Sequence, residues 1–200
     1  MSNKKIEEAK KDFKYLINRG YKKEVAINFV GNHYKLTKLE RLRILREVHS
    51  DKEIEIVKNK LTPLKELKRV YVDGFNVLIT IEAFLKNRVF LCDDGIYRDL
   101  ERVYGKYKIG EYTEKAIKLL LNVLKDKEFC IYLDAQVSKS GELARRIREK
   151  IEKMNLKGKV LCVKNCDSIL KTKPAVMTSD LYIILSEDVK HVVDIIKEVK

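Results

Sequence analysis

The spacing of apolar residues divides the chain into two regions with different periods. Up to about residue 60, apolar side chains recur every three or four positions, which predicts a series of helices. From about residue 67, short β-rich runs alternate with helical stretches, which is typical of a mostly parallel sheet with helices on both faces. Thr62-Pro63 marks the boundary. We therefore expect a helical domain over residues 1–62 and an α/β domain over residues 67–200.

The helical region carries clear end signals. Thr37 and Glu40 have the spacing of a capping box, and Ser50 and Glu53 repeat it. The predicted helices cover 3–19, 22–33 and the segment after Thr37, followed by a short one after Ser50. The second and third helices, joined by a tight turn, resemble a helix-turn-helix arrangement. The apolar stripes that we expect to face the core are Val25, Ala26, Phe29 and Val30 on the second helix, and Leu39, Leu42, Leu45 and Val48 on the third.

The second region predicts five strands, at 69–73, 89–92, 129–134, 159–163 and 175–180. Helical patterns separate them at about 76–86, 96–104, 113–125 and 140–154. Residues 188–199 are also predicted as mostly helical, and residues 181–185 fit either helix or strand.

Acidic residues end four of the five predicted strands, at Asp73, Asp93-Asp94, Asp134 and Asp180. A single strand-end carboxylate is usually a turn former or helix cap. Several that converge on one edge of a sheet repel one another unless something offsets their charge. A divalent cation is the simplest candidate, and Mg²⁺ or Mn²⁺ bound by carboxylates typically acts on phosphates. The chain has no glycine-rich phosphate loop, no Gly-x-Ser-x-Gly elbow and only three histidines.

The formal net charge is +13, and its distribution is uneven. Residues 1–68 hold 18 basic against 10 acidic side chains. This excess predicts a polyanionic partner, of which nucleic acid is the commonest, although general lysine enrichment explains part of it. Arg41, Arg43 and Arg46 lie mostly off the apolar stripe of their helix. They are candidates for phosphate contacts, and a solvated polar face of a small bundle explains them equally well.

Two classes of protein are disfavoured. No run of about 18 apolar residues is present and the first residues form no apolar signal core, so we expect a cytoplasmic protein without a membrane span. The four cysteines are interpreted as core thiols, because no paired Cys-x-x-Cys or histidine cluster accompanies them.

The sequence Tyr-Val-Asp73-Gly-Phe-Asn76-Val-Leu resembles the opening strand of PIN-like nucleases, especially the NYN branch. Ala-Val-Met-Thr-Ser-Asp180 is similar to their late Thr-Ser-Asp motif, and the segment from Leu133 to Ala144 stands in the place of their middle acidic strand end. The resemblance covers roughly residues 68–185. It implies a Rossmann-like PIN-type sheet and metal-dependent hydrolysis of RNA. Arg145 and Arg146 stand near the place where the NYN pattern often has an aspartate.

On this resemblance, Asp73 and Asp180 would bind the metal, and Asp134 with one of Asp93 or Asp94 would complete its shell. Asn76 would orient Asp73 or touch a phosphate, and Lys139 would neutralise charge at the cleft. The competing hypothesis is a non-catalytic nucleic-acid-binding protein on a degenerate nuclease scaffold, and a small-molecule phosphohydrolase ranks last because Asp73-Gly-Phe lacks a second acid.

The whole chain also resembles an uncharacterised archaeal two-domain family. The segments that carry this likeness are Asn18-Arg-Gly-Tyr, Phe29-Val-Gly-Asn-His-Tyr34, Leu91-Cys-Asp-Asp-Gly, Tyr97-Arg-Asp and Gly105-Lys-Tyr. Three roles stay open for the helical domain: it could dock the substrate, form a homodimer or bind another protein.

Overall fold

The computed structural model describes residues 2–101 and 107–200, and it divides into two compact units. The helical unit comprises Met1–Asn59 together with Phe90–Leu100. The α/β unit comprises Lys60–Val89 together with Glu101–Lys200. In the part of the chain described, no helix has the length and apolar composition needed to cross a membrane.

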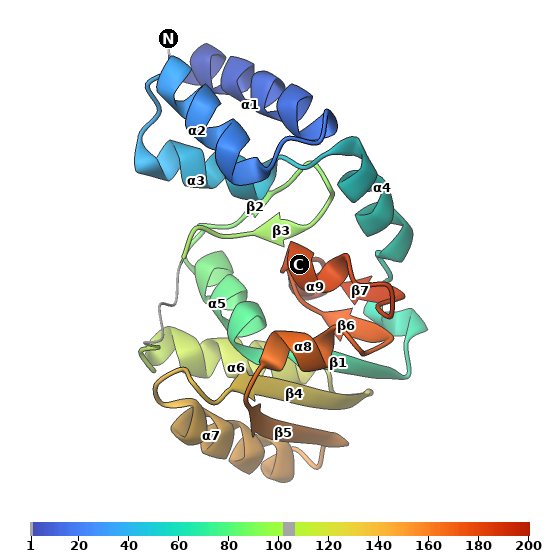
Figure 1. The fold of residues 1–200 in the computed structure, drawn as a ribbon. Coiled ribbons are helices and arrows are strands. Elements are labelled where there is room, and N and C mark those ends of the chain that lie inside the picture. Colours follow the sequence, from blue (N-terminus) through green and yellow to red (C-terminus); the bar gives the residue numbers. More distant parts are fainter. Residues whose placement is uncertain (1, 102–106) are drawn as a thin grey trace. The chain divides into compact units, whose positions relative to one another are not determined.

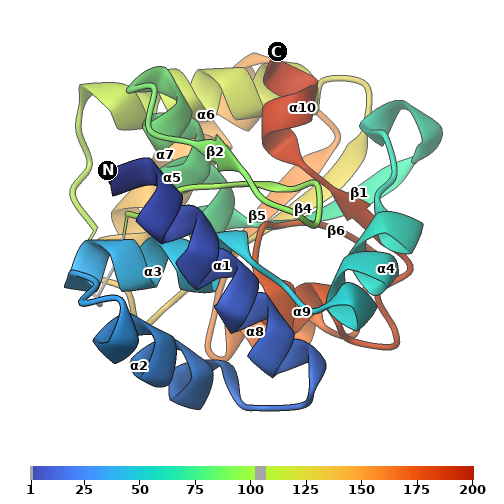
Figure 2. The same ribbon diagram turned by 90° about the horizontal axis from the view of Figure 1, so that it is seen from above.

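The helical unit contains α1 (Ser2–Asn18), α2 (Lys23–His33), α3 (Lys38–Glu47) and α4 (Asp51–Lys60, whose last residue belongs to the α/β unit). Helices α1, α2 and α3 contact one another (Figure 2). Their core holds Ala9, Phe13, Ile17, Ala26, Ile27, Val30, Leu36, Ile44 and Val48. The predicted capping box before α3 is confirmed, since Glu40 N donates to Thr37 Oγ1 and Thr37 N donates to a carboxylate oxygen of Glu40.

The predicted core stripe of α2 is wrong in part. Ala26 and Val30 are buried as expected, but Val25 is 56% exposed and Phe29 is 68% exposed. On α3, Leu39 is exposed and Ile44 is the fully buried residue. The pattern of α2 contains two overlapping apolar stripes one residue apart, so only the position of the neighbouring helices decides which of them is buried.

The α/β unit is built on a five-stranded sheet in the order β5-β4-β1-β6-β7, with every pairing parallel (Figure 1). Its strands are β1 (Arg69–Asp73), β4 (Glu128–Asp134), β5 (Gly158–Val163), β6 (Ala175–Met177) and β7 (His191–Val193). Its helices are η1 (Leu64–Glu66, a 3-10 turn), α5 (Gly74–Leu85), α6 (Glu111–Val123), α7 (Ser140–Lys153), α8 (Cys166–Leu170), α9 (Leu181–Ile184) and α10 (Ile195–Val199). The expected fold class, a helical region followed by a mostly parallel α/β sheet, is therefore confirmed.

Two predictions about the strands are wrong. The run at 89–92 does not join the parallel sheet: β2 (Phe90–Leu91) pairs antiparallel with β3 (Tyr97–Arg98) in a hairpin of the helical unit. The turn between them contains Asp94-Gly95, and Gly95 has a positive φ of 87°. Asp-Gly is a sequence typical of hairpin turns. The predicted helix at 96–104 is accordingly wrong at Tyr97–Arg98, and residues 102–106 lie outside the described residues. The fifth strand of the sheet is His191–Val193, from the tail that was predicted as helical.

Side chains of each strand alternate between two faces of the sheet. The first face carries Val70 and Val72 of β1 and Ile131 and Leu133 of β4, all completely buried. The second face carries Tyr71 and Asp73 of β1 and the residues in register with them on the neighbouring strands.

The direction of the chain explains which helices cover which face. From β1 through β4 to β5 the chain moves one way across the sheet, and α5 and α7 contact these strands. From β5 it returns past β4 and β1 to β6 and then β7, so the handedness of parallel connections places the intervening α8 and α9 on the second face. These two helices contact each other, and α8 contacts β1 and β4.

Gly74 allows α5 to begin directly after β1. A Cβ atom at this position would lie 2.7 Å from the backbone oxygen of Tyr132 and 2.6 Å from Cδ2 of Leu133. The glycine therefore brings the start of α5 against β4, next to Asp73.

We expect Gly74→Ala to lower the free energy of unfolding by about 1–3 kcal/mol, because the added methyl group meets a backbone atom that cannot move without disturbing the sheet. The matched control is Gly141→Ala, also in the first turn of a helix, where a Cβ would meet nothing within 4 Å. That control should be neutral or stabilising by up to about 1 kcal/mol. Urea unfolding of both variants measures the difference, and equal stabilities would contradict the close-approach argument.

Candidate active site

Neighbouring strands β1 and β6 send the chain to opposite faces of the sheet. Asp73 ends β1 and leads into α5, whereas β6 leads through Thr178-Ser179-Asp180 into α9, on the side of α8. In open parallel sheets such a reversal opens a crevice beyond the carboxyl ends of the strands, and ligands bind there. The residues of the two sequence motifs, Asp73 to Asn76 and Thr178 to Asp180, meet at this position.

Hydrogen bonds join the two motifs across the reversal. Thr178 Oγ1 donates to Asp73 Oδ2 at 2.8 Å. Asn76 Oδ1 accepts from Ser179 N at 2.8 Å and from Ser179 Oγ at 3.0 Å. Asp180 N donates to Thr178 Oγ1 at 3.1 Å. Because a backbone N–H can only donate, the amide oxygen of Asn76 must face Ser179, which leaves the Asn76 NH₂ group as a donor for a ligand.

Asp73 is the buried carboxylate of the site, with a relative exposure of 9%. Its pKa is raised from 3.8 to about 7, first by burial and then by the negative charges of Asp180 and Asp167. The hydrogen bond from Thr178 acts in the opposite direction. Asp73 is therefore close to half-protonated at neutral pH. A positive charge nearby would offset the repulsion between its carboxylate and the neighbouring acids.

Two further acids belong to the same group. Asp134 ends β4 and is half-buried, with Oδ1 accepting from Gln136 N at 2.8 Å. Asp167 lies in the first turn of α8, and its pKa is raised by desolvation and by the charges of Asp180 and Asp134. The prediction from sequence included Asp134 and missed Asp167, because it considered only the acids that directly end a strand. Asp167 follows the end of β5 by four residues, and only the return of α8 over the second face brings it here.

The donor chemistry of this group fits Mg²⁺ or Mn²⁺, since all four acids offer carboxylate oxygens. In residues 2–101 and 107–200, however, no three His, Cys, Asp or Glu side chains form a group that could hold a metal ion. One oxygen of Asp180 also accepts from Tyr182 N at 2.7 Å as the cap of α9. These carboxylates have the chemistry of Mg²⁺ ligands, but the described residues form no closed protein cage for an ion.

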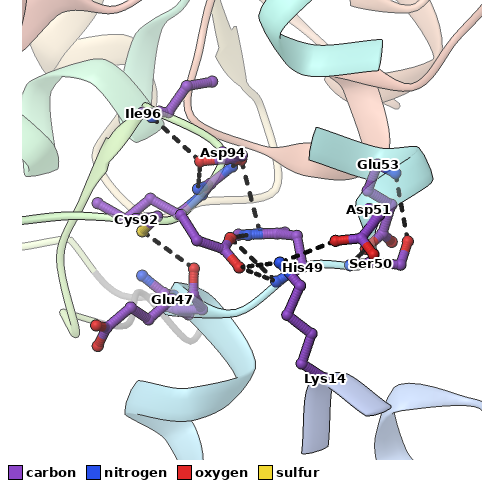
Figure 3. Close-up of polar contacts among 12 residues, drawn as sticks. Lys14, Glu47, His49, Ser50, Asp51, Glu53, Cys92, Asp94 and Ile96 are labelled. Carbon is purple, nitrogen blue, oxygen red and sulfur yellow. Dashed lines mark hydrogen bonds and ion pairs between the residues drawn. The ribbon is translucent and has the colours of Figure 1, made fainter. Parts of the chain in front are cut away.

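Asp93 and Asp94, predicted to share this edge, lie instead in the hairpin of the helical unit. Figure 3 shows the surroundings of Asp94. Asp94 is completely buried and pairs with both terminal nitrogens of Arg98, at 2.8 and 2.6 Å. Asp93 lies 2.8 Å from Nδ1 of the buried His49 and accepts from the His49 backbone N–H. Lys14 forms a further ion pair with Asp93 at 3.4 Å. Asp94 therefore has its partner inside the hairpin, whereas Asp93 joins the hairpin to His49 and to Lys14 of α1. The predicted place of these two acids at the end of a strand of the parallel sheet is wrong.

The three arginines of α3 also have structural partners. Arg41 donates to Leu36 O, Asn28 O and Asn32 Oδ1, and its guanidinium lies against Gly31. Arg43 pairs with Glu47 at 2.6 Å and lies over the ring of Phe90, and Arg46 donates to Asp99 O at 2.6 Å. Each of the three side chains therefore has a partner within the helical unit, and its predicted contact with phosphates stays a prediction. Lys139, in contrast, is exposed just before α7, at φ 65°, and its predicted role stays a prediction.

Comparisons with known proteins place the chain in a family. The model of a domain of unknown function, DUF5616, matches residues 63–198. The chain belongs to the DUF5616 family. The model of a protein of unknown function, DUF434, matches residues 5–60. An uncharacterized protein of Methanocaldococcus jannaschii is 63% identical over 198 residues, covering 96% of this chain and 95% of that protein. No solved structure matches.

These matches confirm the expected likeness to an uncharacterised archaeal protein with two parts. They name no activity, so the nuclease resemblance keeps the status of a proposal. In this DUF5616 domain, the carboxylates at the sheet reversal are therefore the candidate functional groups.

The ion pair of Asp94 and Arg98 yields a stability prediction for the helical unit. We expect Arg98→Met to destabilise it by about 3–5 kcal/mol, because a fully buried carboxylate loses the cation that compensates it. Arg145→Met removes a pair that is 62% and 48% exposed, and should cost no more than about 0.5 kcal/mol. Chemical denaturation followed by circular dichroism compares the two. Similarly small losses of unfolding free energy in the two variants would mean that Arg98 does not compensate a buried charge on Asp94.

The pKa of Asp73 yields a pH prediction for the α/β unit. Since this pKa is higher in the folded chain, about 7, than the ordinary 3.8, protonation stabilises the fold fully below about pH 4, and this contribution is lost as the pH rises to 7. Asp73→Asn cannot ionise, so it should exceed wild type by about 2 kcal/mol or more at pH 8 and nearly equal it at pH 4.

Urea unfolding in EDTA at both pH values tests this expectation. The control is Asp126→Asn, an exposed acid that precedes β4 and so lies at the opposite end of the strand. A wild-type protein as stable as Asp73→Asn at pH 8 would contradict it.

Proposed function

We propose that the α/β unit is a PIN-like, metal-dependent ribonuclease that hydrolyses phosphodiester bonds at the sheet reversal. The observation that carries the proposal is the buried Asp73, fixed by Thr178 and facing the charges of Asp180 and Asp167. Burying carboxylates beside one another lowers the stability of a fold, so such a group is found mainly where function requires it. The Asp-Gly-Phe-Asn and Thr-Ser-Asp motifs that resemble the NYN nucleases supply Asp73, Thr178 and Asp180.

Each residue has a role that follows from its position. Asp73 and Asp180 would bind a Mg²⁺ or Mn²⁺ ion. The negative charges of Asp134 and Asp167 would add to the electrostatic attraction for that ion. A bound divalent cation lowers the pKa of a water molecule and stabilises charge on a phosphate. Asn76, whose oxygen is occupied by Ser179, would donate its NH₂ hydrogens to a phosphate oxygen. Thr178 positions Asp73 through its hydroxyl group.

One observation favours a second candidate, a non-catalytic nucleic-acid-binding protein on the same scaffold. The helix α7 that follows Asp134 offers a single acid in its first turn, Glu142, and Arg146 pairs with it at 2.7 Å. Arg146 pairs with Glu114 as well, at 2.9 Å. The NYN pattern often has an aspartate in this helix, so the metal shell of this chain would lack that contribution.

The decisive experiment measures Mn²⁺ binding by calorimetry and cleavage of single-stranded and structured RNA in Mg²⁺ or Mn²⁺. We expect wild type to bind the ion and cleave. Asp73→Asn should reduce cleavage by about 100-fold or more, a loss typical of removing a preorganised electrostatic group. Asp126→Asn serves as the control with the same loss of charge and should retain full activity.

The outcomes separate the two candidates. RNA binding that is independent of Mn²⁺, with no cleavage, would support the non-catalytic scaffold. Cleavage that survives in Asp73→Asn would rule out this site as its source, and the absence of both binding and cleavage would end both candidates.

A further inference from the structure

The second face of the sheet is sparsely covered beside the carboxylates. Parallel sheets normally have helices on both faces. Here the long helices α5 and α7 contact β1, β4 and β5 on the first face, whereas on the second face the five-residue α8 contacts β1 and β4. The part of this face nearest the amino ends of the strands forms an open groove of about 530 Å³.

The lining of the groove combines aromatic rings with cations. Tyr71 is in register with Cys130, which is in register with Lys159. The ring of Tyr71 lies 6.4 Å from the ring of Tyr132, with an angle of 26° between their planes. Lys173, which follows α8, places its ammonium group 5.4 Å from the centre of the Tyr71 ring. The groove therefore combines two aromatic rings with positive charge at its margin.

The charge at the margin is mostly uncompensated. Arg69 pairs with Glu128 at 2.5 Å. Lys157 and Lys159 are both exposed, and neither forms an ion pair with any residue that the structure describes. Lysines held beside a groove without ion-pair partners favour a ligand that brings negative charge.

The groove and the carboxylates lie on the same face. Tyr71 and Asp73 are two positions apart on β1, and Tyr132 and Asp134 are two positions apart on β4. Two residues along a strand cover about 7 Å. The groove and the carboxylates therefore lie toward opposite ends of the same face, on which α8 contacts β1 and β4.

We propose that this open second face binds an unpaired strand of nucleic acid. A base stacks on Tyr71, and the phosphates lie along Lys157 and Lys159. Aromatic platforms with flanking cations bind single strands in this way, because every base has a flat face and every linkage a charge. The choice of nucleic acid as ligand rests on the proposed function, whereas the location of the strand rests on the groove.

A second copy of the chain fits this face less well. A symmetric contact would place the groove of one copy against the groove of the other, bringing Lys157 and Lys159 near the same lysines of the partner. An uncharged apolar ligand would leave these ammonium groups without compensation. A strand of phosphates satisfies both the charge and the aromatic rings.

The test is fluorescence anisotropy with labelled single-stranded RNA and DNA of about 12 nucleotides, a length within the usual range for such sites. Working in EDTA over a series of salt concentrations keeps binding separate from cleavage. We expect Lys157→Gln/Lys159→Gln to weaken binding about tenfold and to reduce the slope of log affinity against log salt by about 1.4.

The matched control, Lys118→Gln/Lys125→Gln, removes the same charge from exposed positions on and after α6 and should change affinity less than about twofold. Tyr71→Leu should weaken binding at least about fivefold, since stacking is lost while apolar volume is kept. Its control is Tyr112→Leu, an exposed tyrosine on α6. Both lysine variants change only exposed side chains, so the test does not depend on the folding of Tyr71→Leu.

Binding of RNA or DNA through these residues supports the proposal, even if the protein cleaves nothing. Equal affinity of the groove and control variants would overturn it, as would equal binding of duplex and single strands. A change of oligomeric state in Lys157→Gln/Lys159→Gln with unaltered affinity would also overturn it, and would assign the face to a contact between copies. None of these results changes the outcome expected for Mn²⁺ binding and cleavage by Asp73→Asn, so failure of one proposal can be told from failure of the other.

Discussion

The handedness of connections between parallel strands is the constraint on which the α/β unit depends. Because each connection must be right-handed, a chain that moves from β1 to β5 and then returns to β6 must place its helices on opposite faces. The reversal falls between β1 and β6. It brings Asp73 and Asn76 against Thr178 and Ser179, and it leaves part of the second face with little cover.

The carboxylates at the reversal oppose the stability of the fold. Asp73 is buried beside other acids, and the pKa of this group rises accordingly. The hydrogen bond from Thr178 offsets only part of the cost. Burial of these acids beside one another therefore lowers the stability of the α/β unit, and a bound positive charge would restore part of it.

The helical unit shows the opposite use of charge. The carboxylates of Asp93 and Asp94 find their partners in His49 and Arg98, inside the same unit. Arg41 similarly donates to the backbone near the end of α2. A charged residue in a sequence pattern can thus be a candidate ligand group or a member of a structural ion pair. Only the partners that the fold gives it distinguish these two roles.

The sequence by itself determined the division into a helical part and an α/β part, the capping box at Thr37, four of the five strands of the sheet, and Asp73 and Asp134 as strand-end residues. It also singled out Asn76 and Asp180, which lie in the first turn of α5 and at the cap of α9. These features depend on neighbours within a few positions, where periodicity and capping chemistry act. Tertiary structure alone decided that Phe90–Leu91 belongs to a hairpin, that His191–Val193 completes the sheet, that Phe29 faces outward and that Asp167 joins the acids. Short strands and two-sided helices carry too little local preference, so distant packing and the direction of each crossover settle their place.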